Sequence, residues 1–499
     1  MANVAPTLTA GGLEAIYAGE VYTLDLTSSD PGEDTIGRWT IDWGDGQSVD
    51  YVGNPSQLTH RYTGVLGRQL IRASATDEDG SYDLVPLEVN VLPVPLQVTT
   101  FNYDSNGFAV RFNDPFDASA INLYDSTLAN LGLTDILLSG ATSGLVKGSV
   151  VFDADYQGLR YLVSGSGLAA DTYSLTLKSG PKAFHSVFGD LDGNADGSGG
   201  DDYVRKDLII DAAPALRLSL PDFMRGTGQE VNVPAAGKYL PLGLTSAGDV
   251  TNLRFTVRFD PTLLKITGAE AAAGLPSGAT IVPDTSVAGQ ITVTIASATA
   301  IAAGKVTLLN LLAKVPDTAA YGAVEVVDIG NVFANNKAAE RADDDALHVV
   351  GYIGDTNRNA KLDKEDVTLI QRNALKVDSG FAKWSYISPL MVGDVDGDGR
   401  LTTADASRVG QKMNGVPRPE IPDVPTGITV VFATPQPTLS LPRIDFGGSF
   451  TDFTVGSTDP KWTRDNWKKA FVTNMAGSTV NPNSNLKVTL GASLQASVQ

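Results

Sequence analysis

The chain has 499 residues, 42% of them hydrophobic and 19% charged, which is enough for roughly three to five globular domains. Its net charge of −20 excludes nucleic acid as a partner, because no basic stripe exists to neutralise phosphates. The absence of cysteine excludes disulfides, thiolate metal sites and thiol nucleophiles. No apolar run reaches the roughly 18 residues of a transmembrane helix. The N-terminus lacks the pattern of a secretory signal, so we expect a removed signal, a longer precursor or an uncleaved export route.

Residues 6–93 alternate apolar and polar positions between turn signals, which predicts a β-sandwich. Within them, aromatic residues would pack the core while Gly44 and Gly46 allow a tight turn. The segment resembles a PKD domain, an immunoglobulin-like sandwich that usually acts as a spacer or weak binder in extracellular proteins. We expect His60 to be a structural hydrogen-bonding residue rather than a ligand. The resemblance rests on Trp39–Gly46, His60–Tyr62 and Ala75–Gly80.

Residues 96–188 follow a short, stiff, proline-containing linker and predict a second β-sandwich. Their best evidence is the clean alternation of Phe108–Phe112 and Tyr173–Leu177. The stretch Asp117–Tyr124 resembles the bacterial Ig-like domains of surface proteins, and this resemblance implies an Ig-like fold for the segment.

An acidic loop occupies residues 189–211, and we call it the linker loop. Read as an EF-hand-type loop of about 12 residues, it carries side-chain oxygens at alternate positions, and Ca²⁺ takes roughly six to eight oxygen ligands. We predict a calcium loop that stiffens the joint to the next domain, followed by one helix over Tyr203–Ile210. The alternative is a flexible Gly/Asp linker. The predicted ligands, with Asp190 at position 1, are Asp190, Asp192, Asn194, Asp196, Ser198 and Asp201.

Residues 214–350 predict the largest sandwich, because several segments such as Leu253–Phe259 and Ile291–Ile295 alternate with a period of two. The phrase Thr256–Leu264 resembles the F-x-Y-D-P-x-x-L segment of cohesin domains, and Gly304–Leu311 resembles one of their long apolar strands. The resemblance implies a jelly-roll sandwich. The alternative is another β-sandwich of the same general class.

Residues 351–417 contain two further loops of the EF-hand type, each followed by a helical pattern of apolar residues. Position 7 is Lys361 or Arg400, which can offer only a backbone carbonyl oxygen. We predict that both loops bind Ca²⁺; the alternative is a pair of solvated Asp/Asn turns. The predicted sites are Asp355, Asn357, Asn359, Lys361, Asp363 and Asp366 in the first loop, and Asp394, Asp396, Asp398, Arg400, Thr402 and Asp405 in the second.

This duplicated loop and helix resembles a type I dockerin, a small calcium-dependent module that docks onto cohesin domains. The family places Asp at position 12, here Asp366 and Asp405. The first loop departs from the pattern because position 6 is Ala360, whereas the second loop has Gly399. The resemblance also implies partner contacts at loop positions 10 and 11, which are Lys364, Glu365, Thr403 and Ala404.

Residues 426–499 predict a small β-rich region after a proline-rich linker, with alternating pieces at Ile428–Phe432 and Leu486–Leu490. A short helix is predicted over Thr463–Phe471. No family resemblance is found for this region.

No catalytic motif is found, and His60, His185 and His348 each fall in a different predicted domain, so we expect no enzyme activity. The expected fold is mainly β, with tandem Ig-like and jelly-roll sandwiches and a small helical EF-hand-like dockerin. We therefore expect a calcium-binding extracellular or cell-surface protein. Its partners would be copies of itself, in a filament or layer, or another cohesin- or dockerin-bearing surface protein. The alternatives are an adhesion or scaffold module that binds carbohydrate or another surface protein, and the non-catalytic part of a larger hydrolase.

Overall fold

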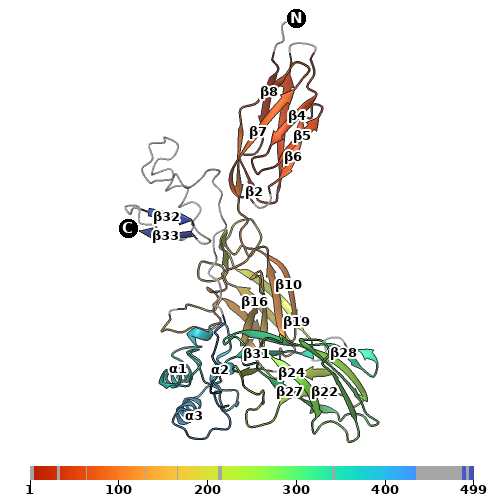
Figure 1. Ribbon diagram of the computed structural model, residues 1–499, viewed down its shortest axis with the longest axis vertical. Coiled ribbons are helices and arrows are strands. Elements are labelled where there is room, and N and C mark those ends of the chain that lie inside the picture. Colours follow the sequence, from red (N-terminus) through yellow and green to blue (C-terminus); the bar gives the residue numbers. More distant parts are fainter. Residues whose placement is uncertain are drawn as a thin grey trace. The chain divides into compact units, whose positions relative to one another are not determined.

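The computed structural model describes residues 5–30, 34–62, 65–129, 131–165, 167–211, 216–339, 343–433, 486–490 and 494–498. It confirms a mainly β chain of stacked sheets with few helices (Figure 1). The chain divides into two compact units: unit 1 contains residues 5–95 and 187–189, and unit 2 contains residues 96–186 and 190–433. Within the described residues, no helix is both long and apolar enough to cross a lipid bilayer.

Unit 1 contains the first sandwich, whose core is built from the aromatic residues that the sequence singles out. Trp39, Trp43 and Tyr62 are fully buried, and the Tyr62 hydroxyl donates to the Trp43 carbonyl (3.1 Å). Gly44 has a φ of +83°, and a Cβ there would lie 2.7 Å from the backbone of Leu70. One sheet has the order β1-β3-β6 and the other β2-β9-β7-β4-β5, with β8 paired to β7. The strands are β1 Thr7–Gly11, β2 Ala15–Tyr17, β3 Val21–Ser29, β4 Arg38–Asp42, β5 Ser48–Val52, β6 Gln57–Arg61, β7 Gly67–Thr76, β8 Ser81–Asp83 and β9 Leu87–Leu92.

Unit 2 begins with the second sandwich, formed by sheets of order β10-β11-β15-β14 and β13-β12-β16-β19. The helix predicted over Tyr203–Ile210 is wrong: this segment is strand β19, paired antiparallel with β16. Its β-branched residues favour a strand, and the unpaired edge of β16 supplies the partner. The strands are β10 Val98–Asp104, β11 Gly107–Phe112, β12 Ile136–Gly140, β13 Gly144–Leu145, β14 Gly148–Phe152, β15 Gly158–Val163, β16 Asp171–Leu177, β17 His185–Ser186, β18 Gly189–Asp190 and β19 Tyr203–Ile210.

The third sandwich packs a sheet of order β24-β27-β22-β20-β30 against one of order β21-β31-β28-β23-β26-β25, with β29 paired to β28. Its core is mostly aliphatic and includes Leu242, Val257 and Ile295, all fully buried. The strands are β20 Arg217–Ser219, β21 Phe223–Arg225, β22 Leu240–Ser246, β23 Asn252–Arg258, β24 Lys265–Ala271, β25 Thr280–Asp284, β26 Gln290–Ala296, β27 Gly304–Lys314, β28 Val324–Ala334, β29 Lys337–Ala338, β30 Asp343–Asp344 and β31 Ala346–Val350.

Residues 351–417 form the paired-loop module, which contains helices α1 Lys364–Ala374, α2 Pro389–Gly393 and α3 Thr403–Met413 and the 3-10 turn η1 Ala382–Trp384. Helices α1 and α3 lie close together (Figure 1) and pack on each other, and α2 contacts β21 of the third sandwich. The apolar faces expected from the sequence point inward, since Ile370, Ala406 and Val409 are fully buried.

One hydrophobic core runs through the second sandwich, the paired-loop module and the near edge of the third sandwich. It contains Val150 of β14, Trp384 and Val409 of the module, and Tyr321 and Val349 of the third sandwich. The module is therefore packed into unit 2 and is not tethered to it by a linker alone.

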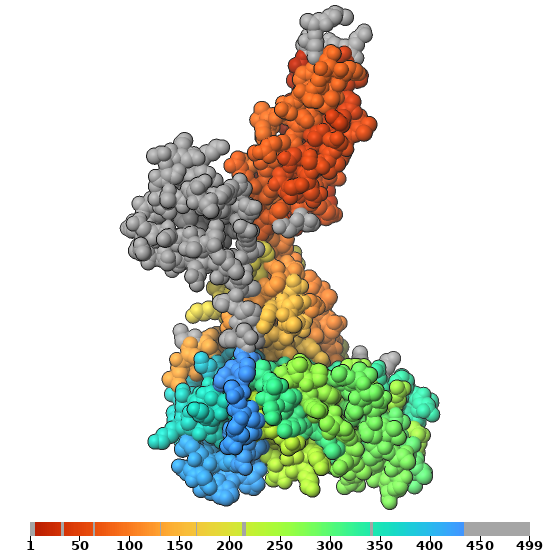
Figure 2. All heavy atoms as spheres, viewed as in Figure 1, coloured from red at the N-terminus to blue at the C-terminus, as the bar shows by residue number. Residues whose placement is uncertain are grey.

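Residues 421–433 form an extended segment, here called the strap, which follows the module along its boundary with the third sandwich (blue in Figure 2). The predicted strand over Ile428–Phe432 is absent, and only a single bridge pairs Phe432 with Tyr321. Farther on, β32 Leu486–Leu490 pairs antiparallel with β33 Leu494–Val498. The helix predicted over Thr463–Phe471 lies outside the described residues.

Candidate metal centre

The first loop (residues 355–366) curls around the carboxylate at its first position. Asp355 is fully buried; its Oδ1 accepts from Asn359 N (3.1 Å) and its Oδ2 from Ala360 N (2.7 Å). The side chain of Asn359 accepts in turn from Lys361 N (2.9 Å). These short-range bonds hold the acidic and amide side chains of the loop close to one another.

The end of the first loop is also the start of α1. Asp363 is the N-cap and accepts from Glu365 N (2.8 Å), while Asp366 Oδ2 accepts from Asp363 N (2.8 Å), which completes a capping box. Oδ1 of Asp366 reaches back to Thr356 N (2.8 Å). Asp366 therefore joins the beginning of the loop to the helix that ends it.

The second loop (residues 394–405) repeats this arrangement. Asp394 accepts from Asp398 N (3.2 Å) and Gly399 N (2.8 Å), and Asp405 accepts from Val395 N (3.2 Å) and Thr402 N (2.9 Å). One carboxylate oxygen from each of three aspartates lies within 4.8 Å of the others. These three residues are Asp394, Asp396 and Asp398.

Both loops use a left-handed backbone at positions 4 and 6. The φ angles are +58° at Arg358 and +62° at Ala360, against +73° at Gly397 and +81° at Gly399. Ala360 thus adopts the glycine conformation despite its Cβ, at a cost of about 1–2 kcal/mol. The departure noticed in the sequence strains the first loop but does not change its path.

The linker loop has the same geometry, but in a register two residues later than the one predicted. Asp192 accepts from Asp196 N (3.1 Å) and Gly197 N (2.8 Å), the bonds that Asp355 and Asp394 make at position 1. Ala195 and Gly197, with φ of +61° and +92°, then fall at positions 4 and 6. Asp190 is therefore not at position 1: it precedes the curl, in β18.

The later half of the linker loop is shorter than in the paired loops. Asp201 accepts from Asn194 N (2.9 Å) at position 3, the kind of contact that Asp366 makes with Asn357 N (3.1 Å). Asp201, at position 10, thus makes the contact that the aspartate at position 12 makes in the paired loops. Ser198 falls at position 7, where the backbone carbonyl is the oxygen that could bind a cation. In this register the candidate side-chain ligands are Asp192, Asn194, Asp196 and Asp201. A glycine at position 6 was the sequence signal for this register.

The chemistry of the paired loops fits a hard divalent cation. They concentrate carboxylate, amide and carbonyl oxygens, which are the ligands of Ca²⁺. Burial raises the pKa of the Asp355 and Asp394 carboxyls to about 6, and it also raises the pKa of Asp366. Buried anions of this kind are costly unless a positive charge compensates them. A cation held by these side chains, with the Lys361 and Arg400 carbonyl oxygens, would supply that charge.

The first loop is tied to its surroundings through Asp355. The hydroxyl of Tyr321, in the connection between β27 and β28, donates to Asp355 Oδ2, and Trp384 Nε1 donates to the Asp355 carbonyl (3.0 Å). The guanidinium of Arg358 lies over the Trp384 ring, 5.1 Å from its centroid. The predicted ligand Asp355 thus contacts both the third sandwich and the segment between the loops. Sequence reasoning gave no role to Tyr321.

The long segment between the loops docks on the second sandwich. Ser385 O accepts from Leu123 N (2.8 Å), and Tyr386 O accepts from Val150 N (2.9 Å). At the end of α1, Asp378 pairs with Arg372 (2.7 Å) and accepts from Thr127 N (2.9 Å). The unusual length of this segment, visible in the sequence, thus provides an interface within the chain.

The residues expected to contact a partner lie in the first turns of the two longer helices. Lys364 and Glu365 begin α1, Thr403 and Ala404 begin α3, and all four are exposed. Docking of the module on the two sandwiches leaves them accessible.

The three histidines make structural contacts. His60 pairs with Asp45 (2.7 Å) and stacks on Trp43, and His348 pairs with Glu325 (2.7 Å) in the third core. His185 Nδ1 lies 3.1 Å from the Ala183 carbonyl. They lie in different sandwiches or sheets and do not form one site.

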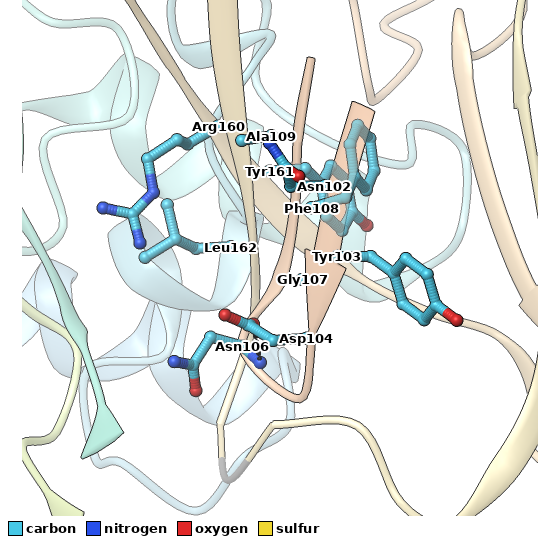
Figure 3. Close-up of a pocket in the computed structure, with 10 residues that line it drawn as sticks. All are labelled: Asn102, Tyr103, Asp104, Asn106, Gly107, Phe108, Ala109, Arg160, Tyr161 and Leu162. Atoms are coloured by element: carbon cyan, nitrogen blue, oxygen red, sulfur yellow. Dashed lines mark hydrogen bonds between the residues drawn. The ribbon is translucent and has the colours of Figure 1, made fainter. Parts of the chain in front are cut away.

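A small pocket lies at the β10–β11 hairpin of the second sandwich (Figure 3). Figure 3 shows Arg160 and Asn106 on one side of the hairpin and Tyr103 directed to the other. Arg160 pairs with the buried Asp345 (2.9 Å) of the third sandwich. The volume of about 100 Å³ is below the roughly 300–1,000 Å³ of sites for drug-sized ligands, so we interpret this feature as a joint between sandwiches.

No family model matches the chain, and no curated protein sequence matches it. Among solved structures, it is similar to the third cohesin of ScaC in complex with the ScaB dockerin from Acetivibrio cellulolyticus (15% identity, 27% of this chain and 98% of that one, TM-score 0.23). It is also similar to the PKD domain of an M14-like peptidase from a Thermoplasmatales archaeon (26% identity, 18% and 98%, TM-score 0.16). A third similar structure contains carbohydrate-binding modules of the β-sandwich superfamily (13% identity, 62% and 99%, TM-score 0.17).

Proposed function

We propose that this protein is a non-catalytic, calcium-dependent structural protein of the cell exterior, in which Ca²⁺ bound by the paired loops holds the parts of unit 2 together. The observation that carries the proposal is the position of Asp355. This buried candidate ligand accepts a hydrogen bond from Tyr321 of the third sandwich, and its carbonyl accepts one from Trp384. A cation at the first loop would therefore act on an interface between domains as well as on its own loop.

An extracellular location agrees with this chemistry. Extracellular calcium modules work with dissociation constants of about 10⁻⁴–10⁻³ M, which suit millimolar Ca²⁺. A chain without cysteine must obtain its stability from its cores and its bound metal.

Calorimetry on the full chain tests this proposal. We expect titration of Ca²⁺ into the EGTA-treated protein to show binding, and thermal unfolding of unit 2 to move to higher temperature in millimolar Ca²⁺. Mg²⁺ serves as the control cation. The absence of both binding heat and a thermal shift would overturn the proposal.

A second candidate function is docking onto a partner through the starts of α1 and α3, and the exposure of Lys364, Glu365, Thr403 and Ala404 favours it. The partner would be the cohesin-like sandwich of another copy, which would build a filament or layer, or a separate surface protein for which this chain is an adhesion or scaffold module.

Light scattering and negative-stain imaging in Ca²⁺ and in EGTA would distinguish the two kinds of partner. For self-assembly we expect polymers that dissolve in EGTA and that Thr403→Arg prevents. Val85→Arg, at a residue of the first sandwich that is 90% exposed, is the matched control. A monomer under all conditions would exclude self-assembly and leave the separate partner.

A further inference from the structure

Tyr321 is the meeting point of three parts of unit 2. Its side chain is fully buried, and its hydroxyl both donates to Asp355 Oδ2 of the first loop and accepts from Tyr352 N (3.0 Å). Its ring lies beside those of Tyr352 (centroids 5.2 Å apart) and Trp384 (6.4 Å). A change in the position of Asp355 therefore directly alters the hydrogen bond that the Tyr321 hydroxyl donates.

The backbone of the same residue holds the end of the strap. Tyr321 N donates to Val431 O (2.7 Å), and Tyr321 O accepts from Ala433 N (2.8 Å). The Phe432 ring meets the Tyr321 ring edge to face, with centroids 5.5 Å apart. The strap and the first loop thus contact the same residue, one through its backbone and ring and the other through its hydroxyl.

Few side chains of the strap are fully buried. Among residues 421–433, all of which the structure describes, only Ile421 is fully buried. Gln229 Nε2 donates to Asp423 O (2.9 Å), but the Asp423 side chain that pairs with Lys412 is itself 92% exposed. Val431 and Phe432 are 60% and 49% exposed. Val424 and Val430 are partly buried and pack against the core of unit 2. The bonds at Tyr321 are therefore a large part of what keeps the end of the strap, around Val431 and Phe432, in place.

We propose that the first loop latches the strap through Tyr321: a divalent cation in the loop holds residues 421–433 down, and its removal releases them. The inference rests on the proposed calcium binding. With a cation present, Asp355 is held in place as a ligand, so its Oδ2 stays in position to accept from the Tyr321 hydroxyl. Without the cation, the buried carboxylates of Asp355 and Asp366 lose the positive charge that compensates them, and the hydrogen bond from Tyr321 loses its fixed acceptor.

Coupling of this kind is reciprocal. If cation binding favours the seated strap, the seated strap must raise the affinity of the first loop for the cation by the same factor. The second loop is not coupled to the strap in this way, because the bonds described for its side chains, such as Asp396 to Arg408 (2.8 Å), stay within the module.

Hydrogen exchange of the full chain, followed by mass spectrometry, tests the latch in millimolar Ca²⁺ and in EGTA. We expect EGTA to speed exchange of peptides covering 421–433 by about tenfold or more. Tyr321→Phe keeps the ring and the backbone bonds but removes the hydroxyl, so its strap should exchange fast even in Ca²⁺. Tyr352→Phe is the matched control: its hydroxyl donates to Thr227 O (3.2 Å), and it should retain the calcium dependence.

A second variant covers the case in which Tyr321→Phe fails to fold. Phe432→Ala removes an exposed ring from the strap, and we expect it to weaken calcium binding at the first loop. Combining it with Asp394→Asn, which disables the second loop, assigns the measured heat of binding to the first loop. Calcium binding by calorimetry with unchanged strap exchange and unchanged Phe432→Ala affinity would overturn the latch and leave the proposed function standing. Absence of calcium binding altogether would overturn both.

Discussion

The two loops of the module have the same backbone conformation but differ in their surroundings. The first is strained at Ala360 but anchored by Tyr321 and Trp384, whereas the second has the relaxed Gly399 and makes its described side-chain contacts inside the module. The comparison teaches that two loops of the same sequence pattern can differ in how they contact the rest of the protein. The first loop, with the less favourable Ala360, contacts the third sandwich through Tyr321. The described side-chain contacts of the second loop, with the more regular Gly399, include none to a sandwich.

The largest effect should come from removing the indole that supports the first loop. Trp384→Ala deletes a fully buried ring and the donor to the Asp355 carbonyl, so we expect unit 2 to lose about 3–5 kcal/mol of unfolding free energy. Denaturant unfolding in Ca²⁺ measures this loss. Leu375→Ala, at the 67% exposed C-cap of α1, is the control and should change little. A small loss for Trp384→Ala would mean that the first loop is not anchored as described.

Neutralising the first candidate ligand of each loop should separate the roles that we propose for them. Asp355→Asn and Asp394→Asn should each abolish or weaken binding at one loop, but only Asp355→Asn should lower the stability of unit 2 in Ca²⁺ by a further 1–3 kcal/mol or so, since it weakens the bond from Tyr321. In EGTA, Asp355→Asn should be at least as stable as Asp394→Asn, because a buried amide needs no compensating cation. Equal effects of the two substitutions on the thermal midpoint would erase the distinction between the loops.

The pH dependence of stability should reveal the buried carboxyls when no cation is present. Burial raises the folded-state pKa values of Asp355 and Asp394 to about 6, above the usual 3.8 of an aspartate, so the folded state binds more protons than the unfolded state between these values. Their contribution is full below about pH 4 and is lost as the pH rises through about 6. In EGTA, the thermal midpoint of unit 2 should therefore fall from pH 4.5 to pH 7. Burial also raises the pKa of Asp135, Asp222 and Asp345 in the same unit, so Ca²⁺ should make the fall smaller without removing it. Equal falls in Ca²⁺ and in EGTA would contradict a cation at Asp355 and Asp394.

The smallest effects should come from exchanging the residues at position 6. Ala360→Gly relieves a left-handed alanine and should strengthen the first loop by about 1 kcal/mol, whereas Gly399→Ala should weaken the second by a similar amount. No atom lies within 4 Å of a Cβ placed on Gly399, so the change there reports backbone strain alone. Calcium titration of each single variant measures both. The same sign for both substitutions would show that the backbone conformation is not what differs between the loops.

Much of the fold could be predicted from the sequence because its signals are local. The alternation in Phe108–Phe112 and Leu253–Phe259 marks strands β11 and β23, and the spacing of oxygens before two apolar helices marks where the paired loops lie. The linker loop shows the limit of spacing alone. Starting at Asp190 or at Asp192 satisfies the alternation equally well. The glycine at position 6 favours the start at Asp192, and the backbone bonds to Asp196 N and Gly197 N establish it.

The rest depends on contacts that no local pattern contains. Tyr321 and Asp355 are 34 residues apart and meet only because β28 and β31 bring the two connections together. Strand β19 likewise exists because β16 offers an edge, although its position after an acidic loop suggested a helix. Partner-dependent features of this kind become visible once the sheets are assembled.

The continuous core of unit 2 has a consequence for how the protein unfolds. Segments that read as separate domains in the sequence share one set of buried side chains, from Val150 through Trp384 to Tyr321. Elements that bury each other's surface lose their stability together, so these segments should behave as one cooperative unit. Excising the module would expose apolar faces on both sandwiches, and isolated pieces should be less soluble and less stable than the intact unit. The stabilisation that a cation provides at one short loop would then be shared by the several hundred residues of unit 2.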